Sequence, residues 1–175
     1  MAHIHFSWLY PVDPHTLFRI LTRLEHLERK AEYLGHRGHK MLELRERDGL
    51  FRSVTRRRVD IEVPWWFLPG KLIPSSRITQ HQLWEPGDYA GNRRYAARVE
   101  LQRVPATVTG EGRLISVDYT ATRYEIDLDI VSHMPLVSRT VEQRVAEQMT
   151  EAIDGEHEFR LLWLDRRSQR HSAWG

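Results

Sequence analysis

Histidine is the residue type in this sequence best suited to metal chemistry, but its spacing does not complete a site. His3 and His5 are two positions apart, so on a strand both would lie on one face and could chelate a metal ion. Ile4, Phe6 and Trp8 alternate with them, which makes the histidine face the solvated one. The sequence has no HExxH motif and no cysteine, so a ligand set of zinc-site spacing is missing. We therefore predict no metal site.

Motifs for covalent and phosphoryl chemistry are also missing from the sequence. There is no GxSxG motif, no glycine-rich phosphate loop and no cysteine nucleophile. The acidic residues fall mostly on the outer faces of the expected strands and helix. The sequence thus predicts no catalytic residue and no cofactor, and it favours a binding protein over an enzyme.

Arginine is the commonest charged group that could recognise an anion. The 26 basic residues nearly cancel the 24 acidic ones, leaving a formal charge of +2. Arg56, Arg57 and Arg58 are consecutive, but successive strand residues point to opposite faces, and Asp60 and Glu62 follow closely. Because neither the net charge nor this run makes a basic footprint, we predict no nucleic-acid partner.

Arg57 is two, four and six positions before Val59, Ile61 and Val63, so on a strand it lies on the same apolar face as these residues. A buried arginine needs a partner. Arg57 is therefore either an anchor for a ligand or half of a structural ion pair, with Glu111 as the candidate acid.

The segment VPWWFLPGKLIP, residues 63–74, concentrates aromatic side chains between prolines. The prolines exclude a regular helix or strand of ordinary length. The adjacent Trp65 and Trp66 cannot both face inward on an extended backbone. Three interpretations stay open: the rings cap the end of the core, they form a hydrophobic lid over a cavity mouth, or they form a tip that makes transient membrane contact.

The periodicity predicts the elements that position these residues. A strand over residues 3–9 precedes a helix with Asp13 as N-cap and Pro14 at N1, and a second short helix ends at Gly35. Six strands of period two follow, from Gly38, over 50–63, 75–84, 94–101 and 107–117, and around 124–130. A helical pattern then runs from Pro135 to about Arg167, with its apolar face turned inward.

This element order resembles the START-like (SRPBCC, pollen-allergen-like) helix-grip superfamily over essentially the whole chain. The pieces RRRVDIEVPWW, PATVTGEGRL, MPLVSRTVE and EHEFRLLWL are similar to one uncharacterised bacterial family within it. Relatives often have glycine at the positions of Ser138 and Arg139. The resemblance implies an α+β fold: a curved antiparallel sheet of six or seven strands, two short helices after the first strand, and a long C-terminal helix on the concave face, with a cavity between them.

We therefore expect one START-like domain over residues 1–167 and a frayed tail over 168–175. The expected function is binding or transport of a hydrophobic or amphipathic small molecule, such as a lipid, isoprenoid or polyketide-like compound. The alternatives are an enzyme of cyclase or hydrolase type and a protein-interaction adaptor with a filled core. Lacking a signal peptide and a long apolar run, the chain is expected to be cytoplasmic. The candidate ligand-binding residues are Trp65, Trp66, Phe67, Leu68, Arg57, His81, Tyr95, Tyr124, Ile126, Val141, Val145 and Met149.

Overall fold

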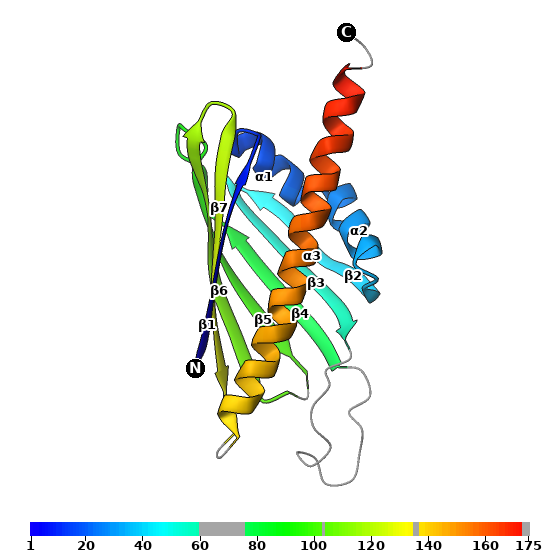
Figure 1. The fold of residues 1–175 in the computed structure, drawn as a ribbon, viewed down its shortest axis with the longest axis vertical. Coiled ribbons are helices and arrows are strands. Elements are labelled where there is room, and N and C mark those ends of the chain that lie inside the picture. The colour runs from blue at the N-terminus through cyan, green and yellow to red at the C-terminus, as the bar shows by residue number, and fades with distance from the viewer. Residues whose placement is uncertain (60–75, 103, 135–136, 173–175) are drawn as a thin grey trace.

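Seven strands form one antiparallel sheet that curves around a long helix in the computed structural model (Figure 1). The structure describes residues 1–59, 76–102, 104–134 and 137–172. The elements are β1 (Ala2–Tyr10), α1 (Pro14–Thr22), α2 (Leu24–Tyr33), β2 (Arg37–Arg47), β3 (Leu50–Val59), β4 (Ser76–Trp84), β5 (Arg93–Leu101), β6 (Ala106–Asp118), β7 (Ala121–Ser132) and α3 (Ser138–Ser172). The strand order is β1-β7-β6-β5-β4-β3-β2, and every neighbouring pair is antiparallel.

Local signals in the sequence account for the element boundaries. The Asp13 side chain accepts a hydrogen bond of 2.9 Å from the backbone N–H of Thr16, and Pro14 follows it, so α1 begins as predicted. Gly35 has a φ of 63° just after α2, the left-handed conformation of a residue that ends a helix. Asp48 and Gly49, with φ of 52° and 77°, make the tight turn between β2 and β3.

The predicted helix-grip fold is confirmed, because α3 lies across the concave face of the sheet (Figure 1). The alternation on β7 holds: Tyr124, Ile126, Leu128 and Ile130 are all at most 5% exposed. α3 continues to Ser172, past the expected helix end near Arg167. None of the helices in the described part of the chain is long and apolar enough to cross a membrane.

Two glycines of β6 make room for large side chains on the inner face. The ladders to β5 and β7 continue in register through Gly110 and Gly112. A Cβ atom on Gly112 would overlap the ring of Tyr95, and one on Gly110 would overlap Leu128. These glycines therefore let inner side chains lie flat against the sheet.

The apolar core lies between the sheet and α3 and has two clusters. One lies where α1 closes the sheet, and there the ring of Phe18 meets those of Phe51 and Trp84 at 6.0 and 5.4 Å. The other surrounds the first half of α3, where Val141 and Val145 are 7% and 3% exposed. The alternation of residues along the strands and the helical spacing on α3 thus bring the apolar face of the sheet and the apolar face of the helix together.

Candidate ligand-binding cavity

A cavity of about 210 Å³ separates α3 from the inner face of β3, β4 and β5. This volume is below the range of about 300–1,000 Å³ usual for ligand pockets. Six of its lining side chains are apolar: Val59, Ile78, Leu101, Val145, Met149 and Ala152. The polar ones are His36, Arg57, Gln148 and Glu151.

Regular structure brings these side chains together. Arg57 of β3 is directly opposite Ile78 of β4, so the two share the inner face. On α3, Val145 and Met149 are four residues apart and therefore lie on one side of the helix. The cavity is thus bounded by one face of the sheet and one stripe of the helix.

Arg57 is the distinctive polar group of the cavity. Within the described part of the chain, its buried Nε atom has no hydrogen-bond partner and its guanidinium makes no ion pair. Burial lowers the pKa of Arg57, and the carboxylate of Glu156 opposes that effect. The candidate partner Glu111 is exposed and belongs to the outer face of β6, so the proposed pair with Arg57 is wrong.

At neutral pH the cavity carries little other charge. Burial and the nearby Arg57 lower the pKa of His36 to about 4, so its imidazole is neutral at pH 7. Glu151 is exposed at the rim. Arg57 is therefore the positive charge that an entering ligand meets.

A second polar cluster, which we call the buried ion-pair cluster, lies farther along α3. Glu156 accepts from Arg160 at 3.0 Å and is 2.9 Å from the Nζ of Lys30 on α2. Burial would raise the pKa of Glu156, but Lys30 and Arg160 outweigh it and lower the pKa to about 2. The Glu156 carboxylate is therefore charged and holds two cations between helices.

Tyrosines extend this cluster to the sheet. Arg160, 2% exposed, donates to the hydroxyl of Tyr10 at 3.1 Å, and Tyr10 lies 2.7 Å from Nδ1 of His157. Tyr124 donates to Tyr95 at 3.0 Å, and burial raises the pKa of Tyr124 to about 12. These groups bind one another and do not line the cavity.

Sequence reasoning did not find the buried ion-pair cluster, although a signal for it was present. Glu156 and Arg160 are four residues apart, and Arg160 is four residues before Leu164, which is buried in the core. Two opposite charges on the apolar stripe of a helix indicate an internal ion pair. Lys30 carried no comparable signal, because its role depends on how α2 packs on α3.

The structure separates the predicted ligand-binding residues. Arg57, Val145 and Met149 line the cavity. The other described inner-face residues are packed in the core instead: Tyr95, Tyr124, Ile126 and Val141. The remaining predicted residues, Trp65, Trp66, Phe67 and Leu68, lie outside the described residues, so their proposed role as a lid stays a prediction.

His81 is a correction, because it does not face the cavity. It shares a face with Leu83, two residues on, and that face is the outer one: Leu83 is 44% exposed, whereas Ile78 and Trp84 are buried. The His81 imidazole instead lies 3.8 Å from the carboxylate of Glu100. His36 and Gln148, which do line the cavity, were missed.

The paired histidines near the N-terminus lie on the outer face of β1. Nδ1 of His3 is 3.0 Å from Asp129, and Nδ1 of His5 is 2.7 Å from Asp127. Among the described residues, no three His, Asp or Glu side chains converge in a way that could hold a metal ion.

Comparisons with known proteins agree with this geometry. Residues 5–164 match a family model described as "Protein of unknown function (DUF2505)". No curated protein matches the chain in sequence. The fold is similar to that of the Zhui aromatase/cyclase from Streptomyces sp. R1128, with a TM-score of 0.65 and 16% identity over 95% of each chain.

Two further solved structures share the fold. A START superfamily protein from Mycobacterium smegmatis has a TM-score of 0.58 and 15% identity over 93% of this chain and 98% of its own. Norcoclaurine synthase from Thalictrum flavum, solved with dopamine and hydroxybenzaldehyde, has a TM-score of 0.53 and 9% identity over 91% and 86%. At these identities the likeness shows the fold, which is the START-like helix-grip fold.

Proposed function

The chain belongs to the DUF2505 family, and we propose that its cavity binds a small amphipathic molecule through an anionic group. The observation that carries this proposal is Arg57, a half-buried cation on the inner face whose buried Nε has no hydrogen-bond partner among the described residues. Removing part of a charged group from water without pairing it is costly, so a ligand anion that pairs with Arg57 would recover that cost.

The rest of the lining fits the apolar part of such a molecule. Side chains of Ile78, Val145 and Met149 lie within the same cavity as Arg57. A carboxylate or phosphate at Arg57 would leave the remainder of the ligand against these side chains, where apolar contact stabilises it. With about 210 Å³ available, the cavity fits a short molecule or one end of a longer one.

One structure with the same fold supports binding of a small molecule with an apolar part, although not the anionic group, which rests on Arg57 alone. Norcoclaurine synthase was solved with dopamine and hydroxybenzaldehyde, both small molecules with an apolar ring. An enzymatic role is the second candidate, and polar groups converging in the cavity would favour it. The hydrogen-bonded tyrosines do not supply them, because Tyr95 and Tyr124 are 4% and 3% exposed and line no part of the cavity.

Titration of octanoate and 1-octanol by isothermal calorimetry tests the proposal. The two probes share an apolar chain and differ in the charged head. The wild-type protein is expected to bind octanoate more tightly than octanol. Arg57→Gln should weaken octanoate binding ten-fold or more, since a hydrogen bond to a charged group contributes about 1.5–3 kcal/mol. Octanol binding should change little.

Stability measurements separate a ligand anchor from a structural charge. Arg57→Gln removes no ion pair within the described part of the chain, so the free energy of unfolding should stay the same or rise. Arg123→Gln, an exposed change on β7, is the matched control and should leave both affinities intact. Equal affinity of the wild type for both probes, or no binding of either, would refute the proposal.

A further inference from the structure

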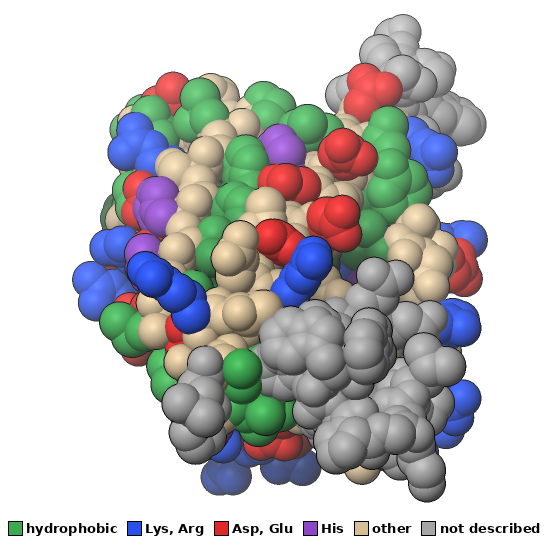
Figure 2. Space-filling view, turned by 60° about the horizontal axis from the view of Figure 1, so that its bottom comes forward, with side chains coloured by type: hydrophobic (Ala, Val, Ile, Leu, Met, Phe, Trp, Pro, Cys, Tyr) green, Lys and Arg blue, Asp and Glu red, His purple; other side chains and the backbone are tan. Residues whose placement is uncertain are grey.

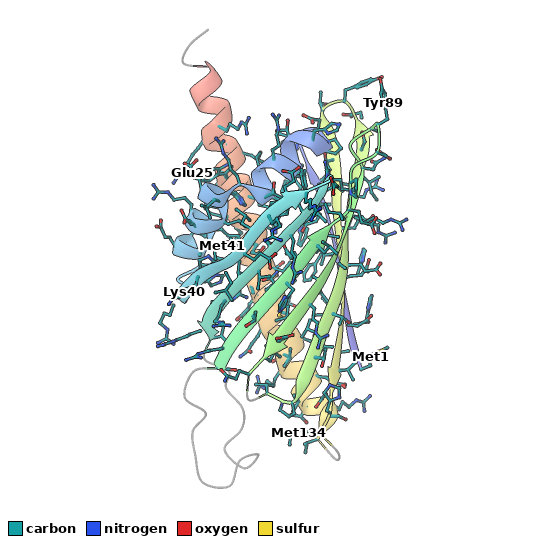
Figure 3. The ribbon with its side chains drawn as sticks, turned by 180° about the vertical axis from the view of Figure 1, so that it is seen from behind. Met1, Glu25, Lys40, Met41, Tyr89 and Met134 are labelled. Atoms are coloured by element: carbon teal, nitrogen blue, oxygen red, sulfur yellow. The ribbon has the colours of Figure 1, made fainter. Side chains whose placement is uncertain are left out.

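The outer face of β2, β3 and β4 aligns basic side chains across three strands. Arg58 is directly opposite Arg37 on β2 and Arg77 on β4. One step along the same face, Arg56 is opposite Lys40. Arg56 and Arg58 point to the outer face and Arg57 to the inner one. The register places basic residues of β2 and β4 beside Arg56 and Arg58, so the basic side chains of the outer face are continuous across the three strands. Figure 3 looks onto this face, with Lys40 at the edge on β2.

We call this surface the basic face. We define it by seven exposed basic side chains: Arg37, Lys40, Arg45, Arg52, Arg56, Arg58 and Arg77. Glu43, 3.4 Å from Arg52, offsets part of the charge. Within the described part of the chain, Arg56, Arg58 and Arg77 make no ion pair. Like charges directly opposite on neighbouring strands are destabilising, so an external anion would relieve this repulsion.

Several exposed acidic side chains lie away from the basic face, although Glu43 lies on it and Glu100 lines the hollow at its border, and the formal charge of the chain is only +2. Asp127 and Asp129 lie on β7, near the edge of the sheet opposite to β2. The solvent face of α3 exposes Glu147, Glu151 and Glu158, and Figure 2 shows acidic side chains gathered over this helix. These acidic side chains lie away from the basic face, so an anionic surface would favour an orientation with the basic face toward it.

The basic face lies on the opposite side of the sheet from the cavity, and the two come close at the end of β5. A shallow hollow of about 390 Å³ on the outer side is lined by Arg56, Arg77 and Thr79, and by Glu100, Leu101 and Gln102 at the end of β5. Leu101 of β5 borders both this hollow and the internal cavity. A partner docked on the basic face would thus lie beside the cavity in which an amphipathic ligand is expected.

We propose that the basic face docks on a bilayer surface containing anionic phospholipid. The choice of lipid follows from two observations. The described outer residues of β2, β3, β4 and β5 include no Phe, Tyr or Trp on which nucleic-acid bases could stack. The hollow beside the basic face also shares Leu101 with the internal cavity on the other side of the sheet, so a bilayer docked here would lie near one end of that cavity. This second observation rests on the proposed function, whereas the docking surface itself uses residues other than Arg57.

Vesicle flotation with the full chain tests the docking surface. The probes are phosphatidylcholine vesicles with and without about 30% phosphatidylserine. Wild-type protein is expected to float with the anionic vesicles alone, and high salt should release it. The triple variant Arg56→Gln, Arg58→Gln, Arg77→Gln should bind about 100-fold more weakly, because each basic residue near an anionic surface strengthens binding about five-fold.

The matched control removes the same charge from other surfaces. Arg29→Gln, Arg139→Gln and Arg144→Gln change exposed residues of α2 and α3, and binding to anionic vesicles should fall far less. Equal loss in both triple variants would mean that net charge, not the basic face, drives binding, and would overturn the proposal. The proposal would also be overturned if wild-type protein did not bind anionic vesicles but bound a single-stranded RNA oligomer at the same salt concentration. Vesicle binding without octanoate binding would leave the docking surface intact and reject the cavity ligand.

Discussion

His26 contributes to the pH dependence of the stability of this protein, and His26→Phe is expected to remove that contribution. The side chain is 1% exposed, and the ring centroids of Phe159 and Trp163 are each 5.2 Å from its own. Neither ring nitrogen has a hydrogen-bond partner within the described part of the chain. Burial, helped by the positive charge of Lys30, lowers the pKa of His26 from 6.5 to about 3.

The sign and size of the effect follow from this pKa difference. The unfolded chain protonates His26 below about pH 6.5, whereas the folded protein resists protonation until about pH 3. Stability from the neutral imidazole is therefore complete above pH 6.5 and is lost as the pH falls toward 3. Linkage makes the loss about 2 kcal/mol at pH 5 and about 3 kcal/mol at pH 4.

Urea unfolding of wild type and His26→Phe at pH 7 and pH 5 measures this loss. Phenylalanine keeps an aromatic ring between Phe159 and Trp163 and removes two unpartnered nitrogens, so the variant should be at least as stable at pH 7. From pH 7 to pH 5 the wild type should lose about 2 kcal/mol more than the variant. Titrating groups common to both proteins cancel in this difference. His133→Phe, at an exposed position, controls for the substitution itself. An equal loss in wild type and variant would refute the reasoning.

Two further substitutions test the packing between sheet and helix. Gly112→Ala would force a Cβ into the ring of Tyr95 and should destabilise the protein by about 1–3 kcal/mol, as measured by thermal unfolding. A smaller loss of stability would show that the ring can move aside. Glu156→Ala leaves Lys30 and Arg160 as uncompensated buried charges and should cost about 3–5 kcal/mol, whereas removing the exposed Glu147 carboxylate should cost under about 1 kcal/mol. Similar losses for the two glutamates would contradict a buried ion-pair cluster.

Much of the fold was determined by local features of the sequence. The alternation at 124–130 predicted the inner face of β7, and Asp13, Gly35 and the turn at 48–49 predicted element ends. These features act over a few residues, through backbone conformation, capping and side-chain direction, so they can be predicted from the sequence without knowledge of tertiary contacts. The element order then sufficed for the helix-grip architecture.

The charged features depended on tertiary structure. His81 was a candidate ligand-binding residue, but the sequence could not show which face of β4 is inside, because both faces carry apolar residues. Arg56–Arg58 read as a dispersed run, and only the register of β3 with β2 and β4 turned half of it into a basic face. Lys30 and Glu156 are far apart in sequence and meet where α2 packs on α3. Periodicity therefore determined which residues share a face, whereas strand pairing and helix packing decided which charges become neighbours, because Coulomb interactions depend on distances that the fold alone sets.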